Sequence, residues 1–217
     1  RRHDGADRLA IKLQHEGLEH FARRSANRFR RLQPDALGIR VIVITRQREG
    51  DIGFGERKLP EGKTTYGLLT HGLNMLGHTL IGWRYWDLVR ALDLLETLPM
   101  VDTSRIGVMG LSLGGEMTMF LAGMQPRVHA ACVCGYLTSH LGTFLDEPHC
   151  TCGALRDLAM HFEHVDLAAL IAPRPLFLDS GRKDPMFHTP EAEALVRELR
   201  PVYALFDKPQ EHLGIEV

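Results

Sequence analysis

The stretch Arg105-Ile106-Gly107-Val108-Met109-Gly110-Leu111-Ser112-Leu113-Gly114-Gly115 decides the fold of this chain. Its apolar first half is typical of a buried strand, and helix-period apolar residues follow from Leu113 to Met124. Between the two lies Gly110-Leu111-Ser112-Leu113-Gly114, a G-x-S-x-G pattern. In such a turn the serine has a strained backbone, and its neighbours two residues away must be small. The context therefore predicts a nucleophile elbow with positive φ at Ser112; a glycine-rich turn with an idle serine is the alternative.

Strands and helices alternate on both sides of this elbow. Apolar runs predict strands near residues 39–45, 106–111, 129–134 and 175–179, and a last strand from His212 to Val217. Helix-period spacing predicts helices over Thr79–Leu98, Leu113–Met124 and about Thr189–Leu205, with Thr189 as N-cap and Pro190 at the first helical position. This order predicts an α/β fold, a mainly parallel sheet with helices on both faces.

The N-terminal third gives weaker signals. Residues Glu16 to Leu32 have apolar positions at near-helical spacing and predict a helix. The segment Arg46 to Gly77 is rich in glycine, threonine and charge, and indicates a long loop. No strand is evident before residue 10. Neither an internal repeat nor an interdomain linker is visible, so residues 1–217 are expected to form one domain that is incomplete at both ends.

Composition excludes several classes of protein. The chain has 217 residues, 44% of them hydrophobic and 24% charged, and a formal net charge of −1. These values suit one globular domain and give no global attraction to nucleic acid or an anionic membrane. The four cysteines form two C-x-C pairs, which suits neither a disulfide framework nor a zinc ribbon and mildly favours a reducing, cytoplasmic compartment.

The run VDTSRIGVMGLSLGGEMTMFLAGMQPRVHAACVCGYL (residues 101–137) resembles the α/β-hydrolase superfamily, specifically its dienelactone-hydrolase-like and acetyl-xylan-esterase-like serine esterases. The segments WDLVRALDLLETLP, AALIAPRPLFLDSGRKDPMF and Gly53–Arg57 extend the resemblance over roughly residues 37 to 217. The resemblance implies an ester hydrolase with a Ser–His–acid triad and an acyl-enzyme. Dienelactone hydrolases proper carry cysteine as nucleophile, so Ser112 indicates the esterase side of the group.

Two aspartates compete for the place of the triad acid. In this fold the triad follows the order Ser, Asp or Glu, His, and the acid lies in the loop after a late strand. Asp184 matches the family's acid position, after the strand Pro175–Asp179. Asp179 is the rival, although it lies at the end of the strand itself. A turn-forming role before proline is the structural alternative for Asp184.

No histidine of this sequence is well placed to be the general base of the triad. His188 and His212 are the two histidines after Asp184. His188 follows the acid by four residues, which leaves little room for an imidazole between acid and serine, and His212 precedes the last strand and should lie at the opposite sheet edge. The resemblance implies a histidine just after this strand. The base is therefore expected beyond Val217, the chain by itself is expected to be inert, and an unexpected ring such as His149 stays an alternative.

The oxyanion donors are expected from two places. The first is the Leu113 backbone N–H, at the N-terminus of the helix that follows Ser112. The second normally comes from a loop after an early strand, of which His3-Asp4-Gly5 is a candidate remnant. Trp83 and Trp86 are expected in the core, with a substrate platform as the alternative.

No cofactor or metal is expected. One short segment contains residue types that can ligate metals: Glu147, His149, Cys150 and Cys152. The resemblance places a polar, cysteine-containing loop there without a metal, so a loop beside the substrate pocket is the preferred interpretation. His71, His78, His161 and His164 are interpreted as surface histidines or as histidines with satisfied hydrogen bonds.

The sequence as a whole predicts a serine-dependent hydrolase of small-molecule carboxylic esters, acting through an acyl-enzyme on Ser112. A serine peptidase of the prolyl-oligopeptidase type is the enzymatic alternative, and a hydrolase-like scaffold without catalysis is the non-enzymatic one. No nucleic-acid or membrane partner is expected. The acyl and alcohol groups of the substrate and the oligomeric state stay open.

Overall fold

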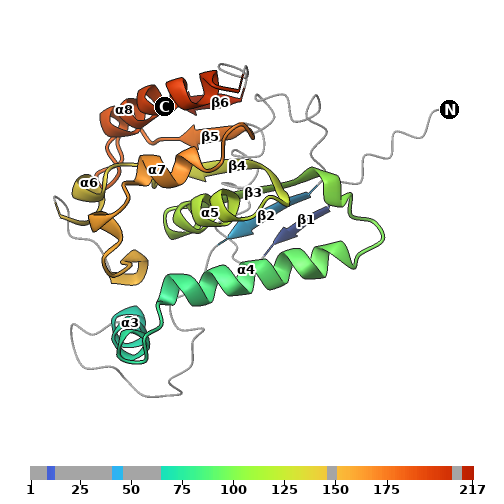
Figure 1. Cartoon of the computed structure of the whole chain (residues 1–217), viewed down its shortest axis with the longest axis horizontal. Coiled ribbons are helices and arrows are strands. Elements are labelled where there is room, and N and C mark those ends of the chain that lie inside the picture. The colour runs from blue at the N-terminus through green and yellow to red at the C-terminus, as the bar shows by residue number, and fades with distance from the viewer. Residues whose placement is uncertain (1–8, 13–40, 46–64, 146–150, 207–211) are drawn as a thin grey trace.

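The computed structural model describes residues 9–12, 41–45, 65–145, 151–206 and 212–217. Six strands form one parallel sheet in the order β1-β2-β3-β4-β5-β6 (Figure 1). Their bounds are β1 Leu9–Lys12, β2 Val41–Thr45, β3 Ile106–Leu111, β4 Val128–Cys134, β5 Leu176–Asp179 and β6 Leu213–Glu216. Because every strand runs in the same direction, all their carboxyl ends lie at one edge of the sheet, where sites of α/β proteins assemble.

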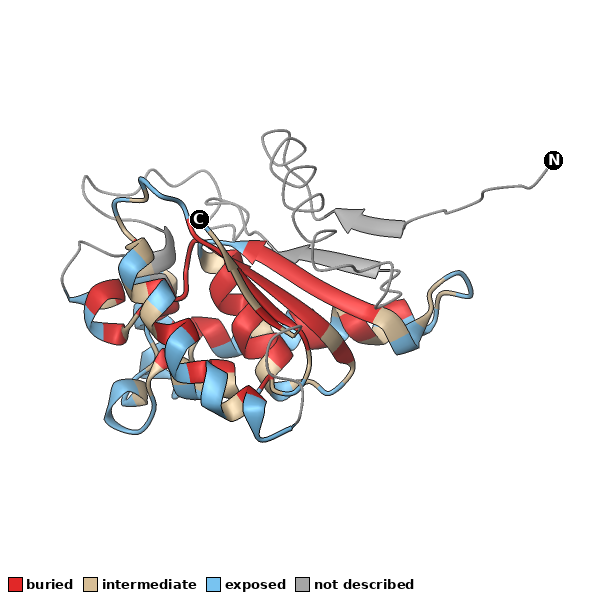
Figure 2. Cartoon of the chain, turned by 90° about the horizontal axis from the view of Figure 1, so that it is seen from above, coloured by how far each residue is buried: buried red, intermediate tan, exposed pale blue. Residues whose placement is uncertain are grey.

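The described helices are α3 Thr65–Met75, α4 Leu80–Glu96, α5 Leu113–Met124, α6 His140–Phe144, α7 His164–Ala169 and α8 Thr189–Ala204. Helix α4 packs against α5, α5 against α7, and α7 against α8, so these four form a layer. Figure 2 shows the described helices gathered along one face of the sheet. None of the described helices is long and apolar enough to cross a membrane.

The core is centred on β3 and α5. Residues Ile106 to Gly110 of β3 are all buried, and so is every residue of α5 from Gly114 to Ala122. A helix that is buried on all sides belongs to the centre of a domain, since an amphipathic surface helix would keep a polar face. The elbow is therefore held between a strand and a helix that are both largely buried.

The predicted strands at 39–45, 106–111, 129–134 and 175–179 are confirmed as β2 to β5, and the last strand as β6. The helices predicted over Thr79–Leu98 and Leu113–Met124 are confirmed as α4 and α5, with Thr79 accepting the Gly82 N–H as N-cap of α4. The helix predicted for Glu16–Leu32 lies outside the described residues.

Three predictions about elements were wrong. Strand β1 begins at Leu9, where no early strand was evident, because its apolar residues lie between Arg8 and Lys12 without a longer apolar run around them. Helix α3 lies within the predicted loop Arg46–Gly77. The N-cap of α8 is His188, while Thr189 is its first helical residue and its hydroxyl donates to the Gly181 carbonyl, 3.2 Å away.

Candidate active site

Ser112 has the backbone conformation that an elbow requires. Its φ is 55° and its ψ is −123°, so the predicted positive φ is confirmed. The Ser112 N–H donates to the Cys134 carbonyl, 2.9 Å away, and the Ser112 carbonyl accepts from the Glu116 N–H at 3.0 Å. The residue thus joins the end of β4 to the first turn of α5 while remaining exposed. This places its hydroxyl at the carboxyl edge of the sheet.

The start of α5 supplies donors at the same point. Leu113 is the first residue of this 12-residue helix, and the first N–H groups of a helix have no partner within it. The partial positive charge of the helix N-terminus adds to their effect on an anion. The Leu113 N–H therefore occupies the position expected of an oxyanion donor.

Glycine at position 115 brings α5 close to the sheet. A Cβ atom on Gly115 would lie 2.9 Å from the Cys134 carbonyl oxygen and 3.0 Å from the Tyr136 Cβ. Both distances are shorter than ordinary van der Waals contacts, and the first involves backbone. The helix can start this near the sheet because residue 115 has no side chain.

Asp184 lies at the edge of the sheet where Ser112 lies. Its Oδ1 accepts the N–H groups of Met186 and Phe187 at 2.9 and 3.0 Å, which fixes the carboxylate. A Cβ on Gly135, just after β4, would lie 3.5 Å from Asp184 Oδ2 and 3.2 Å from Leu111 Cδ1. Within the described part of the chain, Oδ2 has no hydrogen-bond partner. One carboxylate oxygen thus orients the group, and the other remains available beside Gly135, just after β4.

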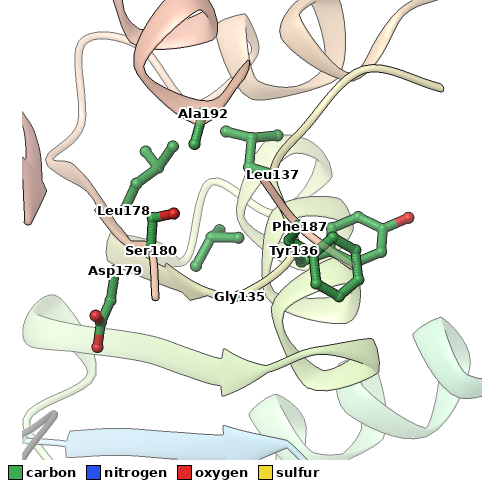
Figure 3. Close-up of a pocket in the computed structure, with 9 residues that line it drawn as sticks. Gly135, Tyr136, Leu137, Leu178, Asp179, Ser180, Phe187 and Ala192 are labelled. Carbon is green, nitrogen blue, oxygen red and sulfur yellow. The ribbon is translucent and has the colours of Figure 1, made fainter. Parts of the chain in front are cut away.

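Asp179 has different surroundings. It ends β5, is buried, and its carbonyl accepts the Gly135 N–H at 2.8 Å. It lines a cavity of about 10 Å³ together with Ser180 and Phe187. In Figure 3 its carboxyl group points away from the other labelled side chains. The two candidate acids therefore share an edge of the sheet, but Asp184 lies in the loop and Asp179 within the strand.

The histidines that follow Asp184 in sequence do not complete a triad. His212 Nδ1 lies 2.7 Å from the Pro173 carbonyl; both residues precede their strands, so His212 is at the opposite edge, as predicted. His188 is the N-cap residue of α8, where its backbone carbonyl accepts the N–H groups of Glu191 and Ala192. Among the described residues, none makes a hydrogen bond to the Ser112 hydroxyl.

Several sequence candidates fall outside what the structure describes. These are His3, Asp4, Gly5, Glu147, His149, Cys150 and the side chain of Cys152. Trp83 and Trp86 are about half exposed, at 52% and 57%, so the expectation that they lie in the core was wrong. The Trp86 ring instead makes a cation–π contact on the surface of α4, with the Arg90 guanidinium 4.2 Å from the ring centroid.

Sequence reasoning missed a buried carboxyl group directly behind the nucleophile. Glu116 is 1% exposed in the first turn of α5, and its Oε2 has no hydrogen-bond partner in the described structure. Burial raises the pKa of Glu116 to about 7, and the nearby Tyr136 hydroxyl opposes that shift. Burial also raises the pKa of Tyr136. The sequence feature that could have indicated this buried carboxyl group is an acidic residue in a helix that is otherwise largely apolar.

Known proteins resemble the chain over much of its length. It is 30% identical to YtaP of Bacillus subtilis, named as a hydrolase, over 70% of this chain and 50% of YtaP. It is 37% identical to the acetyl esterase Axe7A of Xylanibacter ruminicola over 37% of this chain and 18% of Axe7A. The chain thus spans about half the length of the first of these relatives and less of the second.

The fold is shared with solved esterase structures. A crystal structure from Bacteroides fragilis, named as an acetyl xylan esterase, superposes with a TM-score of 0.59 at 21% identity, over 70% of this chain and 40% of that one. Residues 14–143 match the family described as acetyl xylan esterase (AXE1), and residues 84–204 match the dienelactone hydrolase family. The chain therefore belongs to the α/β-hydrolases, in their group of acetyl-xylan-esterase-like and dienelactone-hydrolase-like proteins.

Proposed function

We propose that this protein is a serine hydrolase of carboxylic esters with Ser112 as its nucleophile. The observation that supports this most is the backbone of Ser112, at φ 55° between β3 and the N-terminus of α5. Such a conformation costs of order 1–3 kcal/mol and is found where a site uses it. A scaffold kept for binding alone would gain nothing from it, which favours the enzyme over the scaffold.

In the proposed reaction, Ser112 Oγ attacks the ester carbonyl carbon while an imidazole removes its proton. The Leu113 N–H donates to the oxyanion that forms. As the carbon–oxygen bond of the ester breaks, the imidazolium gives its proton to the departing alcohol and an acyl-Ser112 remains. Water then attacks this acyl group with the same imidazole as base, which releases the carboxylic acid and restores the serine.

Asp184 is proposed to orient that imidazole. Its Oδ2 lies beside Gly135, and the carboxylate is held through Oδ1 by two backbone N–H groups. The imidazole is proposed to come from a residue after β6, as the resemblance to the family implies. Strand β6 is parallel to β5, and Glu216 pairs with Asp179, so the chain leaves β6 at the edge where Asp184 lies.

The proposed substrate is a small acetyl ester. The match to the acetyl xylan esterase family and the similarity to the acetyl esterase Axe7A support an acetyl group rather than a long acyl chain or a peptide. The same similarities favour the esterase over a peptidase of the prolyl-oligopeptidase type.

The test is steady-state hydrolysis of p-nitrophenyl acetate by the full-length protein. Ser112→Ala should lower kcat/KM by at least 10³-fold, since residual catalysis then comes from oxyanion donors and binding alone. Ser104→Ala is the matched control, because Ser104 precedes β3 at the opposite edge and bonds to Asp102; its activity should stay within about twofold of the wild type. Equal activity in the Ser112→Ala protein would refute the proposal.

A further inference from the structure

A cluster of two histidines and one glutamate lies where α6 and α7 meet. His140 is the first residue of α6, Glu163 is the N-cap of α7, and His164 is the first residue of α7. One potential ligand atom from each side chain lies within 4.8 Å of the other two. His140 and His164 are buried, Glu163 is half-buried, and the two imidazole centroids are 4.0 Å apart.

His164 is held by hydrogen bonds at both of its ring nitrogens. Its Nδ1 lies 2.6 Å from the Thr138 carbonyl oxygen, which can only accept, so Nδ1 carries a proton. The lone pair of the neutral ring is therefore on Nε2, which accepts a hydrogen bond from the Tyr136 hydroxyl at 3.3 Å. A ring that donates one N–H to a backbone carbonyl and presents the other nitrogen is the usual arrangement of a metal-ligating histidine.

His140 lacks the hydrogen bonds that a buried imidazole needs. Both of its ring nitrogens are inaccessible to solvent, and neither makes a hydrogen bond in the described structure. Its Nδ1 is 2.8 Å from Glu163 Oε1, but without hydrogen-bond geometry. Burying such groups unsatisfied costs roughly 1–3 kcal/mol each, so a native protein normally provides a partner.

Glu163 adds the negative charge and is fixed in place. Its Oε1 accepts the backbone N–H groups of His140 at 2.8 Å and His164 at 2.7 Å, so the backbones of both histidine residues orient this carboxylate. Two imidazoles and a carboxylate form the donor set that zinc takes in three-ligand protein sites, with a fourth position left for water or another oxygen.

We propose that His140, Glu163 and His164 bind one divalent transition-metal ion of the zinc type. The ion gives one of the two unpartnered nitrogens of His140 a partner, and it replaces the Tyr136 hydroxyl at the lone pair of His164 Nε2. Tetrahedral coordination requires ligand atoms roughly 3.4 Å apart, so the side chains close by about 1 Å around the ion. The ion joins α6 to α7 and fixes the segment from Tyr136 to Ser139, which leads away from the Ser112 edge. Its role is structural, and it is independent of the esterase reaction.

The test measures zinc in the full-length protein after chelation, reloading with Zn²⁺ and desalting. We expect the wild type to hold one more zinc ion per chain than the His140→Gln and His164→Gln variants hold. The wild type should also have a higher Tm with Zn²⁺ than without it. His161→Gln is the matched control, because this nearby histidine is exposed and outside the cluster; it should retain the ion.

Cobalt gives a second readout that needs no variant. Co²⁺ bound to the chelated wild-type protein should give the intense visible absorption of a four-coordinate site, and Zn²⁺ should remove it by competition. Absence of a stoichiometric ion in the wild type, or equal retention in the His140→Gln and His164→Gln proteins, would overturn the proposal. Neither readout uses ester hydrolysis, so failure here leaves the proposed function of Ser112 untouched.

Discussion

Ser112 is held in an unfavourable conformation by hydrogen bonds on both of its peptide groups. The N–H is bonded to the carbonyl of Cys134 at the end of β4, and the carbonyl belongs to the first turn of α5. A non-glycine residue at positive φ is uncommon, and it persists where surrounding structure determines it. The buried strand β3 and helix α5 on either side hold Ser112 in this conformation. The Ser112 side chain therefore lies at the carboxyl edge of the sheet, outside the strand.

The loop carboxylate is the second residue whose role can be tested. Asp184→Asn keeps an oxygen that can accept the Met186 and Phe187 N–H groups, so the loop should survive the change. The charge that stabilises an imidazolium is lost, and kcat for p-nitrophenyl acetate should fall by about 10³–10⁴-fold. Asp179→Asn, measured on folded protein, should lower it by less than about 10-fold. The reverse order of effects would assign the acid to Asp179.

Glu116 should make stability depend on pH. Burial raises the pKa of this carboxyl to about 7 from an ordinary value of 4.5, so between these pH values the folded protein binds more protons than the unfolded chain. The stabilising contribution is complete below about pH 4.5 and is lost as pH rises through about 7. At about 1.4 kcal/mol per pKa unit, the loss is on the order of 3 kcal/mol.

Chemical denaturation at pH 5 and pH 8 measures this contribution. In the volume-matched Glu116→Gln protein, the free energy of unfolding should fall less between the two pH values than in the wild type, by on the order of 3 kcal/mol. Other groups titrate in both proteins, so the difference between the two slopes is the quantity that matters. Identical slopes would mean that Glu116 is ionised without cost in the folded state.

At the scale of elements, the junction of β3, β4 and α5 depends on close approach. The helix begins directly at the ends of two buried strands, where Gly115 faces the carbonyls of Cys134 and Gly110. These are backbone atoms of the central sheet, which cannot move aside as a flexible side chain can. The start of α5 therefore lies so close to the ends of β3 and β4 that residue 115 has no room for a side chain.

Gly115→Ala tests this packing. The added methyl group should destabilise the protein by about 1–3 kcal/mol, seen as a lower denaturation midpoint, and should also lower esterase activity by displacing the start of α5. Gly72→Ala in α3 is the control, because a Cβ there meets no atom within 4 Å. Alanine is a better helix former, so the control should be as stable as the wild type or slightly more. A Gly115→Ala protein of unchanged midpoint would contradict the close approach.

Sequence reasoning predicted the elements that have a strong period and missed those that do not. Strands β2 to β5 lie in apolar runs of the sequence, and helices α4, α5 and α8 are long enough to show a helical period. Helix α6 has five residues and α7 six, which is too few to show a helical period, and the apolar residues of β1 lie between Arg8 and Lys12 without a longer apolar run around them. Helix α3 lies in a stretch rich in glycine and threonine, where local propensity indicated a loop.

At the scale of the whole molecule, the order and direction of the strands bring the residues of the candidate active site to one edge of the sheet. Parallel strands in sequence order bring the ends of β3 and β4 and the loop after β5 to one edge, which places Ser112 and Asp184 together although they are distant in sequence. This much followed from the alternation of elements. The His140–Glu163–His164 cluster could not be predicted in this way, because it depends on how two short helices meet in space. The spacing of the three residues in the sequence does not indicate that they lie together.

The central claim is that Ser112 is an activated nucleophile, and covalent labelling tests it most directly. The full-length protein is treated with a fluorophosphonate, whose phosphorus forms a bond to an activated serine Oγ as fluoride leaves with the hydroxyl proton. Peptide mass spectrometry then locates the adduct. We expect one adduct per chain on Ser112, none in the Ser112→Ala protein and normal labelling in the Ser104→Ala protein. An adduct on another serine, or no adduct in a protein that hydrolyses p-nitrophenyl acetate, would contradict the account.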